Sequence, residues 1–245
     1  MPEKVKRWFR RGEGLLTEWL YPRAANCLCC GDPRRAETTD CLCPRCRKAL
    51  REQRVPPQAC NRCLSPVRRG VPCAFCASPL MRPIEKVFAP FRYRREVRRL
   101  IHAYKFGACG EALPTLCDAM ADALPDRAFD CLTPVPLHPR RLRQRGFNQA
   151  LGLCEGLNQR TGIPIEELLI RTRYHRPQSR LPLRRRGANV TGAFAVEGDA
   201  KGKRILLVDD VRTSGSTAHA CARALMKAGA ESVCLCVAAV VYRKK

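Results

Sequence analysis

The feature that most constrains this chain is a series of four Cys-x-x-Cys pairs in its N-terminal third. Two cysteines at this spacing lie on one tight turn with both sulfurs directed at one ion, and two such turns complete a tetrahedral Cys₄ site. Eight thiolates therefore predict two structural Zn²⁺ sites. The pairs are Cys27/Cys30, Cys43/Cys46, Cys60/Cys63 and Cys73/Cys76, with gaps of 12, 13 and 9 residues between them.

Metal binding would also stabilise the folded structure of this part of the chain. Between Cys27 and Cys76 there are few aliphatic residues, so the segment cannot build a core alone. A structural zinc site supplies on the order of 10 kcal/mol of folding free energy. An iron–sulfur cluster is an alternative because Cys₄ also holds iron, whereas four pairs in series disfavour redox chemistry at an isolated pair. Sequential and crossed pairing of the turns differ little in loop entropy, so both stay open. Cys29 and Cys41 fall off the spacing and are not expected to bind metal.

The other cysteines and the apolar runs indicate a cytoplasmic protein, with peripheral association at the inner membrane as a further expectation. No secretory signal precedes the cysteines, and a reducing compartment disfavours disulfides. No apolar run approaches the ~18 residues that a bilayer span needs. The seven cysteines outside the cluster are expected to be small buried hydrophobes, such as Cys234 and Cys236 on one face of a strand.

The chain is strongly basic, with 46 Lys and Arg against 22 Asp and Glu and a net charge of +24. Such a field attracts nucleic acid, anionic membranes or phosphorylated small molecules, although a coding bias towards arginine is an alternative explanation. Seven arginines and no acids lie in residues 171–186, and basic residues alternate with aromatic ones in residues 86–106. Backbone neutralisation combined with base stacking is typical of single-strand binding. Many of these aromatic residues fit a core equally well.

Three parts can be distinguished along the chain: an amphipathic helical segment over 1–22, a double zinc ribbon over 23–84, and an α/β domain over 85–245. The first segment either lies on a membrane surface or, as we favour, docks on the protein. In the third part, strands are expected over 130–135 and 205–208 and from Ser232, and helices around 94–106, over 142–157 and over 216–228. This alternation predicts a mostly parallel, doubly wound, Rossmann-like sheet.

The most informative stretch of the α/β part is the strand over 205–208 together with the residues directly after it. Asp209 and Asp210 come immediately behind the apolar residues, at the edge where open parallel sheets bind ligands. A loop and helix start rich in hydroxyl groups then present N–H groups to a phosphate. The two carboxylates suit the vicinal hydroxyls of a ribose or a hydrated Mg²⁺, or in the simplest case only cap a turn. The loop and helix start comprise Thr213, Ser214, Gly215, Ser216 and Thr217.

This stretch resembles the phosphoribosyl-pyrophosphate (PRPP) loop of type I phosphoribosyltransferases. Three further motifs narrow the resemblance: Leu100–Phe106 (LIHAYKF), Pro134–Leu137 (PVPL) and Arg145–Gln149 (RGFNQ). Together with the cysteine pairs, the chain from about Trp19 to Tyr242 resembles the ComF competence family, including its GntX-type members. The resemblance implies a type I phosphoribosyltransferase-like domain.

The resemblance also implies roles for individual residues. Asp209 and Asp210 would meet the ribose hydroxyls of Mg²⁺-PRPP, and Thr213–Thr217 would hold its 5′-phosphate. His138–Gln149 would form a loop over the pyrophosphate, with Arg140, Arg141, Arg143 and Arg145 as charge partners. Asp209, Asp210 and Arg145 would be the catalytic residues if the protein turns over. Four arginines without an acid also suit pyrophosphate on charge alone, although a solvated basic helix start would have the same composition.

By this resemblance, the chain is a ComF-like protein of natural transformation that handles single-stranded DNA on the cytoplasmic side and binds PRPP or a related nucleotide. Its further partners would be the DNA-uptake machinery, a helicase or channel at the inner membrane face. The alternative is an active phosphoribosyltransferase with an unknown nucleophile, and a third hypothesis is an adaptor. Thr213 occupies the position where hypoxanthine-type enzymes carry an acidic base, so salvage of a 6-oxopurine is disfavoured.

Overall fold

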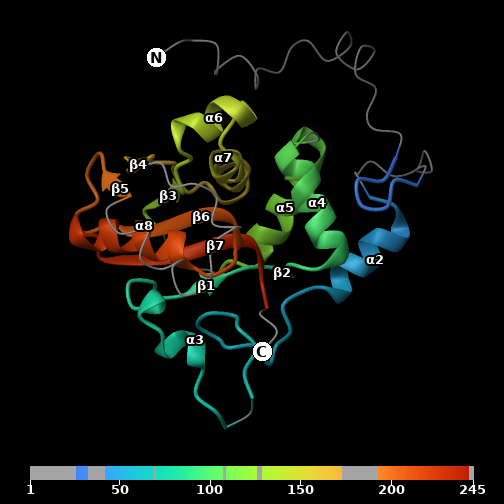
Figure 1. The fold of residues 1–245 in the computed structure, drawn as a ribbon, viewed down its shortest axis with the longest axis horizontal. Coiled ribbons are helices and arrows are strands. Elements are labelled where there is room, and N and C mark those ends of the chain that lie inside the picture. The colour runs from blue at the N-terminus through green and yellow to red at the C-terminus, as the bar shows by residue number, and fades with distance from the viewer. Residues whose placement is uncertain are drawn as a thin grey trace.

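A computed structural model shows an α/β domain with two cysteine-rich extensions (Figure 1). The amphipathic segment 1–22, Cys41 and the arginine-rich residues 173–186 lie outside the part of the chain that it describes. Within that part, no helix combines the length and the hydropathy that a membrane span requires. The described residues are 26–32, 42–68, 70–106, 109–125, 129–172 and 193–242.

A parallel sheet forms the centre of the molecule. Its strand order is β1-β7-β6-β3, and β2 also pairs with β7. All of these pairings are parallel, as expected from the alternation of strands and helices in the sequence. The strands are β1 (Val87–Phe88), β2 (Phe91–Arg92), β3 (Cys131–Pro134), β6 (Arg204–Arg212) and β7 (Ser232–Val240).

Helices cover both faces of this sheet, which confirms the predicted α/β class (Figure 1). On one face α5 (Cys109–Asp122) and α7 (Gln149–Thr161) pack on the strands, and α4 (Arg95–Phe106) packs on α5. On the other face lie α8 (Ser216–Lys227) and the antiparallel pair β4–β5. The remaining elements are α2 (Pro44–Glu52), α3 (Ala74–Ala77), the short 3₁₀ helix η2 (Pro79–Met81), α6 (Pro139–Arg145), β4 (Leu169–Arg171) and β5 (Phe194–Val196).

Two apolar cores result from the alternation of side chains along the strands. Leu206 and Val208 of β6 face the core beneath α4, α5 and α7, whereas Ile205 and Leu207 face the core beneath α8. Cys234 and Cys236 are fully buried in the first core, as expected for cysteines that act as small hydrophobes.

The stretch 142–157 is largely helical, as expected, and it divides into two helices, because Gly146 ends α6 in the left-handed region (φ +79°) and the Asn148 side chain caps α7 by accepting from the Ala150 N–H at 3.1 Å. One expectation about a strand boundary was wrong. The strand expected over 205–208 continues to Arg212, because β7 keeps pairing with it as far as Val240. Asp209 and Asp210 therefore lie within a strand and not in the loop behind it.

Candidate metal groups and candidate phosphate site

The eight paired cysteines form two Cys₄ groups. Within each group all four Sγ atoms lie within 4.8 Å of one another. Tetrahedral Zn–S bonds of about 2.3 Å place sulfurs about 3.8 Å apart, and Cys30–Cys43 and Cys63–Cys73 lie at 3.7 and 3.4 Å. Each group could therefore hold one zinc ion. The first group is Cys27, Cys30, Cys43 and Cys46, and the second is Cys60, Cys63, Cys73 and Cys76, so the pairing of turns is sequential.

The backbone around the cysteines has the shape of metal-binding turns. In the first group the Gly31 N–H donates to the Cys27 carbonyl at 2.9 Å, and in the second the Leu64 N–H donates to the Cys60 carbonyl at 2.8 Å. Gly31 and Leu64 both have positive φ, +79° and +58°, which closes the turn directly after the second cysteine. At Leu64 this conformation costs free energy that a glycine would not lose.

Hydrogen bonds from the backbone prepare one sulfur of the first group for metal. Burial acts to raise the pKa of the Cys27 thiol, but the backbone N–H groups of Cys43, Cys30 and Cys29 outweigh it and lower the pKa to about 7. The Cys43 N–H donates to Cys27 Sγ at 3.3 Å. Cys29 stands apart from the group, since its Sγ–H donates to the Glu96 carbonyl at 3.4 Å.

Each Cys₄ group docks on a different part of the α/β domain. The first contacts α4, where Arg99 donates to the Cys29 carbonyl at 3.3 Å. The second enters the core beneath α8: Cys63 is fully buried there, and Arg62 Nη2 donates to the carbonyls of Met81 and Ile84 at 3.0 and 2.9 Å. Metal at these groups would therefore hold segments on which the main domain packs.

The acid pair lies at the carboxyl end of β6, half-buried beside a lysine from another element. Asp210 forms an ion pair with Lys105 of α4, with Nζ and Oδ2 2.7 Å apart. Asp209 Oδ1 accepts a hydrogen bond from the Asp210 N–H at 2.8 Å. Lys105 thus neutralises the charge of the Asp210 carboxylate, whereas the charge of the Asp209 carboxylate is balanced less completely.

This difference appears in the protonation of Asp209. Burial raises the pKa of Asp209 to about 7, and the neighbouring charge of Asp210 adds to the effect. The Asp210 N–H, Lys105 and Arg171 oppose it only in part. Asp209 therefore titrates near neutrality, where ionisation costs stability in the ligand-free protein.

Replacing Asp209 by asparagine is expected to stabilise the ligand-free protein more at pH 8 than at pH 5.5. The folded-state pKa of about 7 exceeds the unfolded value of ~3.9, so the stability that this group contributes is fully present below pH 4 and is lost as the pH rises through 7. The variant's advantage should grow by roughly 2 kcal/mol over this range. Urea unfolding at a series of pH values measures it, with Asp199→Asn as the control. An advantage of Asp209→Asn that does not change with pH would contradict the expectation.

A candidate phosphate-binding loop comes after the acids, at the start of α8. Gly215 precedes the helix with φ +77°, a conformation that glycine adopts without strain, and the N–H of Ser216, the first residue of the helix, donates to Ser214 Oγ at 3.4 Å. Ser214 and Ser216 have their hydroxyls 3.0 Å apart. Thr213 is exposed, whereas Gly215 and Ser216 are buried. An anion at this helix start would meet N–H groups, hydroxyls and the positive end of the helix dipole.

Basic side chains gather around His138, and one of them, Arg171, also lies near Asp209. Burial lowers the pKa of His138, the residue that caps α6, and four guanidinium groups lower it further: those of Arg171, Arg140, Arg143 and Arg141. Arg171 also lies within electrostatic range of Asp209, and its Nε is buried without a hydrogen-bond partner in the described part of the chain. Arg140 and Arg141 thus lie near His138 at the start of α6, and Arg171 lies within range of both this group and Asp209. The side chain of Arg145 is outside the described residues.

Lys105 and Arg171 are two site residues that the sequence interpretation missed. Lys105 lies in the LIHAYKF motif, which pointed to the family but not to a contact with Asp210. Arg171 opens the arginine-rich segment, whose composition suggests a nucleic-acid surface. No local pattern separates it from its neighbours, because its proximity to Asp209 depends on β4 lying over the sheet face.

These features define a class: a phosphoribosyltransferase-like α/β domain carrying two Cys₄ groups. The model of the phosphoribosyl transferase domain matches residues 156–245. DNA utilization protein YhgH of Escherichia coli O157:H7 is 33% identical over 85% of this chain and 89% of its own. Competence protein ComFC is 28% identical in Bacillus subtilis (77% of this chain, 79% of its own) and 25% in Streptococcus pneumoniae (84% and 96%). The chain belongs to the ComF competence family that includes YhgH and ComFC, as the sequence motifs predicted.

Proposed function

We propose that the carboxyl edge of β6 and the start of α8 bind Mg²⁺-PRPP or a related nucleotide. Asp209 and Asp210 would accept hydrogen bonds from the two ribose hydroxyls. The loop Thr213–Gly215 and the first turn of α8 would hold the 5′-phosphate, and Arg140 and Arg141 would face the pyrophosphate. Mg²⁺ would neutralise the charge of the bound pyrophosphate.

One observation carries this proposal: acidic and basic groups lie side by side on one edge of the sheet. The half-buried carboxylates of β6 pair with Lys105 of α4 and lie within electrostatic range of Arg171 of β4, and Arg171 in turn lies within range of His138 and Arg141 at α6. A ligand that matches both needs hydroxyl donors next to phosphate groups, which is the chemistry of a phosphorylated ribose. Titration of the zinc-loaded protein with Mg²⁺-PRPP in a calorimeter tests this, and the absence of measurable heat at millimolar ligand would overturn it.

We further propose that single-stranded DNA binds across α2 and α4. The two helices pack together, and Gln53 at the end of α2 donates to the Glu96 carboxylate of α4. Phe106 is 60% exposed at the end of α4 and lies against His102, with ring centroids 4.5 Å apart and the ring planes tilted by 40°. Phosphate contacts with an adjacent aromatic platform are what sequence-tolerant single-strand binding requires. The exposed basic residues of this α2/α4 surface are Arg45, Lys48, Arg51, Arg94, Arg95, Arg98 and Arg99.

Charge removal on the α2/α4 surface should weaken DNA binding and flatten its salt dependence. The triple variant Lys48→Gln/Arg94→Gln/Arg98→Gln removes three positive charges, and each single-strand phosphate contact contributes about 0.7 to the slope of log K against log salt. We expect the slope for an oligothymidylate to fall by about 2 in fluorescence anisotropy titrations.

The matched control removes the same charge from the α8 side of the molecule, where Lys201, Arg223 and Lys227 are exposed. This control should leave the slope within about 0.5 of the wild type. Equal slopes for all three proteins would contradict binding on the α2/α4 surface.

The biological role that we propose is DNA uptake, in keeping with the names of the relatives. The protein would receive single strands on the cytoplasmic side, in contact with the helicase or channel of the uptake machinery at the inner membrane. The described part of the chain supports the DNA-binding step through its basic α2/α4 surface and the nucleotide step through the β6–α8 edge.

An active phosphoribosyltransferase is the second candidate function. Arg171 and the arginines around His138 would stabilise departing pyrophosphate, and catalysis would otherwise come from positioning. The loop after Asp210 carries no carboxylate up to Glu231, so a base of the hypoxanthine type is absent. The test is to measure pyrophosphate release from PRPP in the presence of a panel of nucleobases and amines. Tight PRPP binding without pyrophosphate release would mean that the protein binds PRPP but is not a phosphoribosyltransferase.

A further inference from the structure

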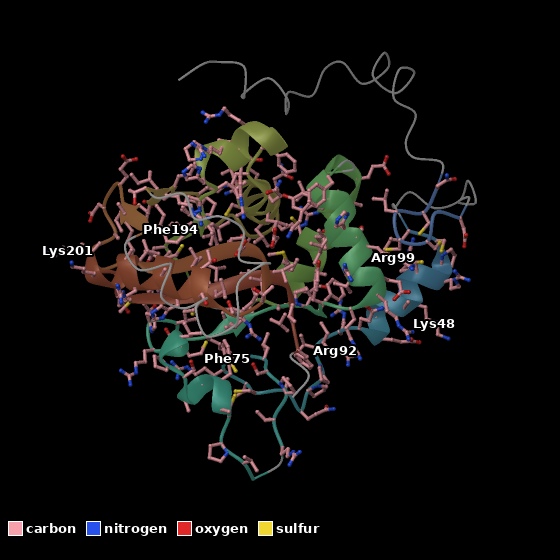
Figure 2. All side chains as sticks on the ribbon, in the orientation of Figure 1. Lys48, Phe75, Arg92, Arg99, Phe194 and Lys201 are labelled. Carbon is pink, nitrogen blue, oxygen red and sulfur yellow. The ribbon has the colours of Figure 1, made fainter. Side chains whose placement is uncertain are left out.

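The second Cys₄ group touches the candidate phosphate loop through a single aromatic side chain. Phe75 lies between Cys73 and Cys76, in the short helix α3. A methyl group placed on Gly215 would lie only 3.2 Å from Cζ of Phe75, so the edge of the ring rests on the glycine of the loop. Figure 2 shows Phe75 on the metal-binding segment beneath the sheet.

The same ring also holds the end of the strand that leads into the loop. The guanidinium of Arg212, the last residue of β6, lies over the Phe75 ring at 4.6 Å from its centroid. Arg212 is 4% exposed, and its Nη2 reaches Ser65 Oγ, next to the second Cys₄ group, at 3.5 Å. A desolvated cation over an aromatic face makes a substantial contact. Helix α8, which comes after the loop, packs against η2 of the same cysteine-rich segment.

The first Cys₄ group has no comparable contact among the described residues. It meets α4 at Glu96 and Arg99, whereas the residue of α4 that reaches the acids is Lys105, about 9 Å further along the helix axis. The two groups are chemically alike, with four cysteines each, but their surroundings differ. Comparing a variant near each group therefore distinguishes a local effect on the phosphate loop from a general effect of metal binding.

We propose that the second Cys₄ group positions the phosphate loop through Phe75, so that a metal-loaded group sets the affinity of the loop for a phosphate. Helix α3 spans only Ala74–Ala77, too short to be stable alone, so the metal fixes the place of the ring. The ring in turn fixes Gly215 and Arg212. Without it, the ligand itself must order the loop, which weakens binding. The inference rests on the proposed PRPP site, and Phe75 is a positioning residue within it.

The test compares Phe75→Ala with Leu28→Ala, which removes an apolar side chain between the first two cysteines of the first group. Three probes are titrated in the presence of Mg²⁺: PRPP, ribose 5-phosphate and inorganic pyrophosphate. In Phe75→Ala we expect PRPP and ribose 5-phosphate to bind 10- to 50-fold more weakly. Pyrophosphate, which would meet the arginines of α6 instead of the loop, should change less than twofold. Leu28→Ala should bind all three like the wild type, and both variants should retain two zinc ions per chain by elemental analysis.

Each other result has a defined meaning. Wild-type affinity of Phe75→Ala for all three probes, with zinc retained, would overturn the inference and leave the PRPP site intact. Equal weakening of all three probes would also overturn it, because that result indicates general damage. If wild-type protein binds neither PRPP nor ribose 5-phosphate, the proposed site itself fails. Should Phe75→Ala lose zinc, Phe75→Leu keeps most of the apolar volume without the ring, and the same pattern of affinities decides.

Discussion

Replacing Cys63 by serine is expected to remove one of two zinc ions and to unfold much of the domain. A structural zinc site contributes about 10 kcal/mol or more, which is as large as the whole stability of a typical domain. Cys63 is fully buried in the core beneath α8, so the loss reaches the sheet itself and not only the cysteine-rich segment. Elemental analysis gives the zinc content, and circular dichroism during urea unfolding gives the stability.

Cys29→Ser is the matched control for this experiment. Cys29 is buried and adjacent in sequence to Cys30, but it lies outside the Cys₄ group, and its Sγ–H donates to the Glu96 carbonyl. It should retain two zinc ions and lose about 1 kcal/mol. Retention of native stability and of two zinc ions by Cys63→Ser would refute the assignment of the second group.

The double substitution Asp209→Asn/Asp210→Asn is expected to weaken Mg²⁺-PRPP binding at least 100-fold. Hydrogen bonds from ligand hydroxyls to charged acceptors contribute about 1.5–3 kcal/mol each, so the loss of two accounts for this factor. Calorimetric titration measures it. The substitution leaves the Lys105 ammonium without its carboxylate partner, so binding of inorganic pyrophosphate should persist or strengthen.

Asp199→Asn serves as the control, because Asp199 is exposed and its carboxylate accepts a hydrogen bond from the Lys201 N–H, away from the acid pair. It should bind PRPP like the wild type. Unchanged PRPP affinity in the double variant would mean that the ligand binds elsewhere, and loss of pyrophosphate together with PRPP would point to a disrupted fold.

Features that depend on short stretches of chain could be predicted from the sequence. Cysteine spacing identified the eight candidate ligands, because each turn is defined by four consecutive residues. The apolar run before Asp209 and the hydroxyl-rich loop behind it located the candidate site. The order of pairing could not be predicted, since sequential and crossed closure differ little in entropy, and the structure shows the sequential one.

Features that depend on contacts between distant segments could not be predicted. Asp210 and Lys105 come together only because α4 packs beside the end of β6. The length of β6 depends on continued pairing with β7, which no property of β6 alone reveals. The break between α6 and α7 is different: Gly146 and Asn148 are visible in the sequence as a helix stop and a helix start within a stretch that the sequence indicated only as largely helical.

Because Cys63 is buried in the core of the α/β domain, the cysteine-rich segment and that domain cannot evolve independently. Cys63 and Met81 fill the same core as Ile205, Leu207 and Leu225. A recombination that exchanged the cysteine-rich segment for an unrelated one would leave that face of the sheet open to water. The segment and the sheet must therefore change together over generations, and a lineage that lost the second Cys₄ group would have to rebuild the core beneath α8 with apolar side chains.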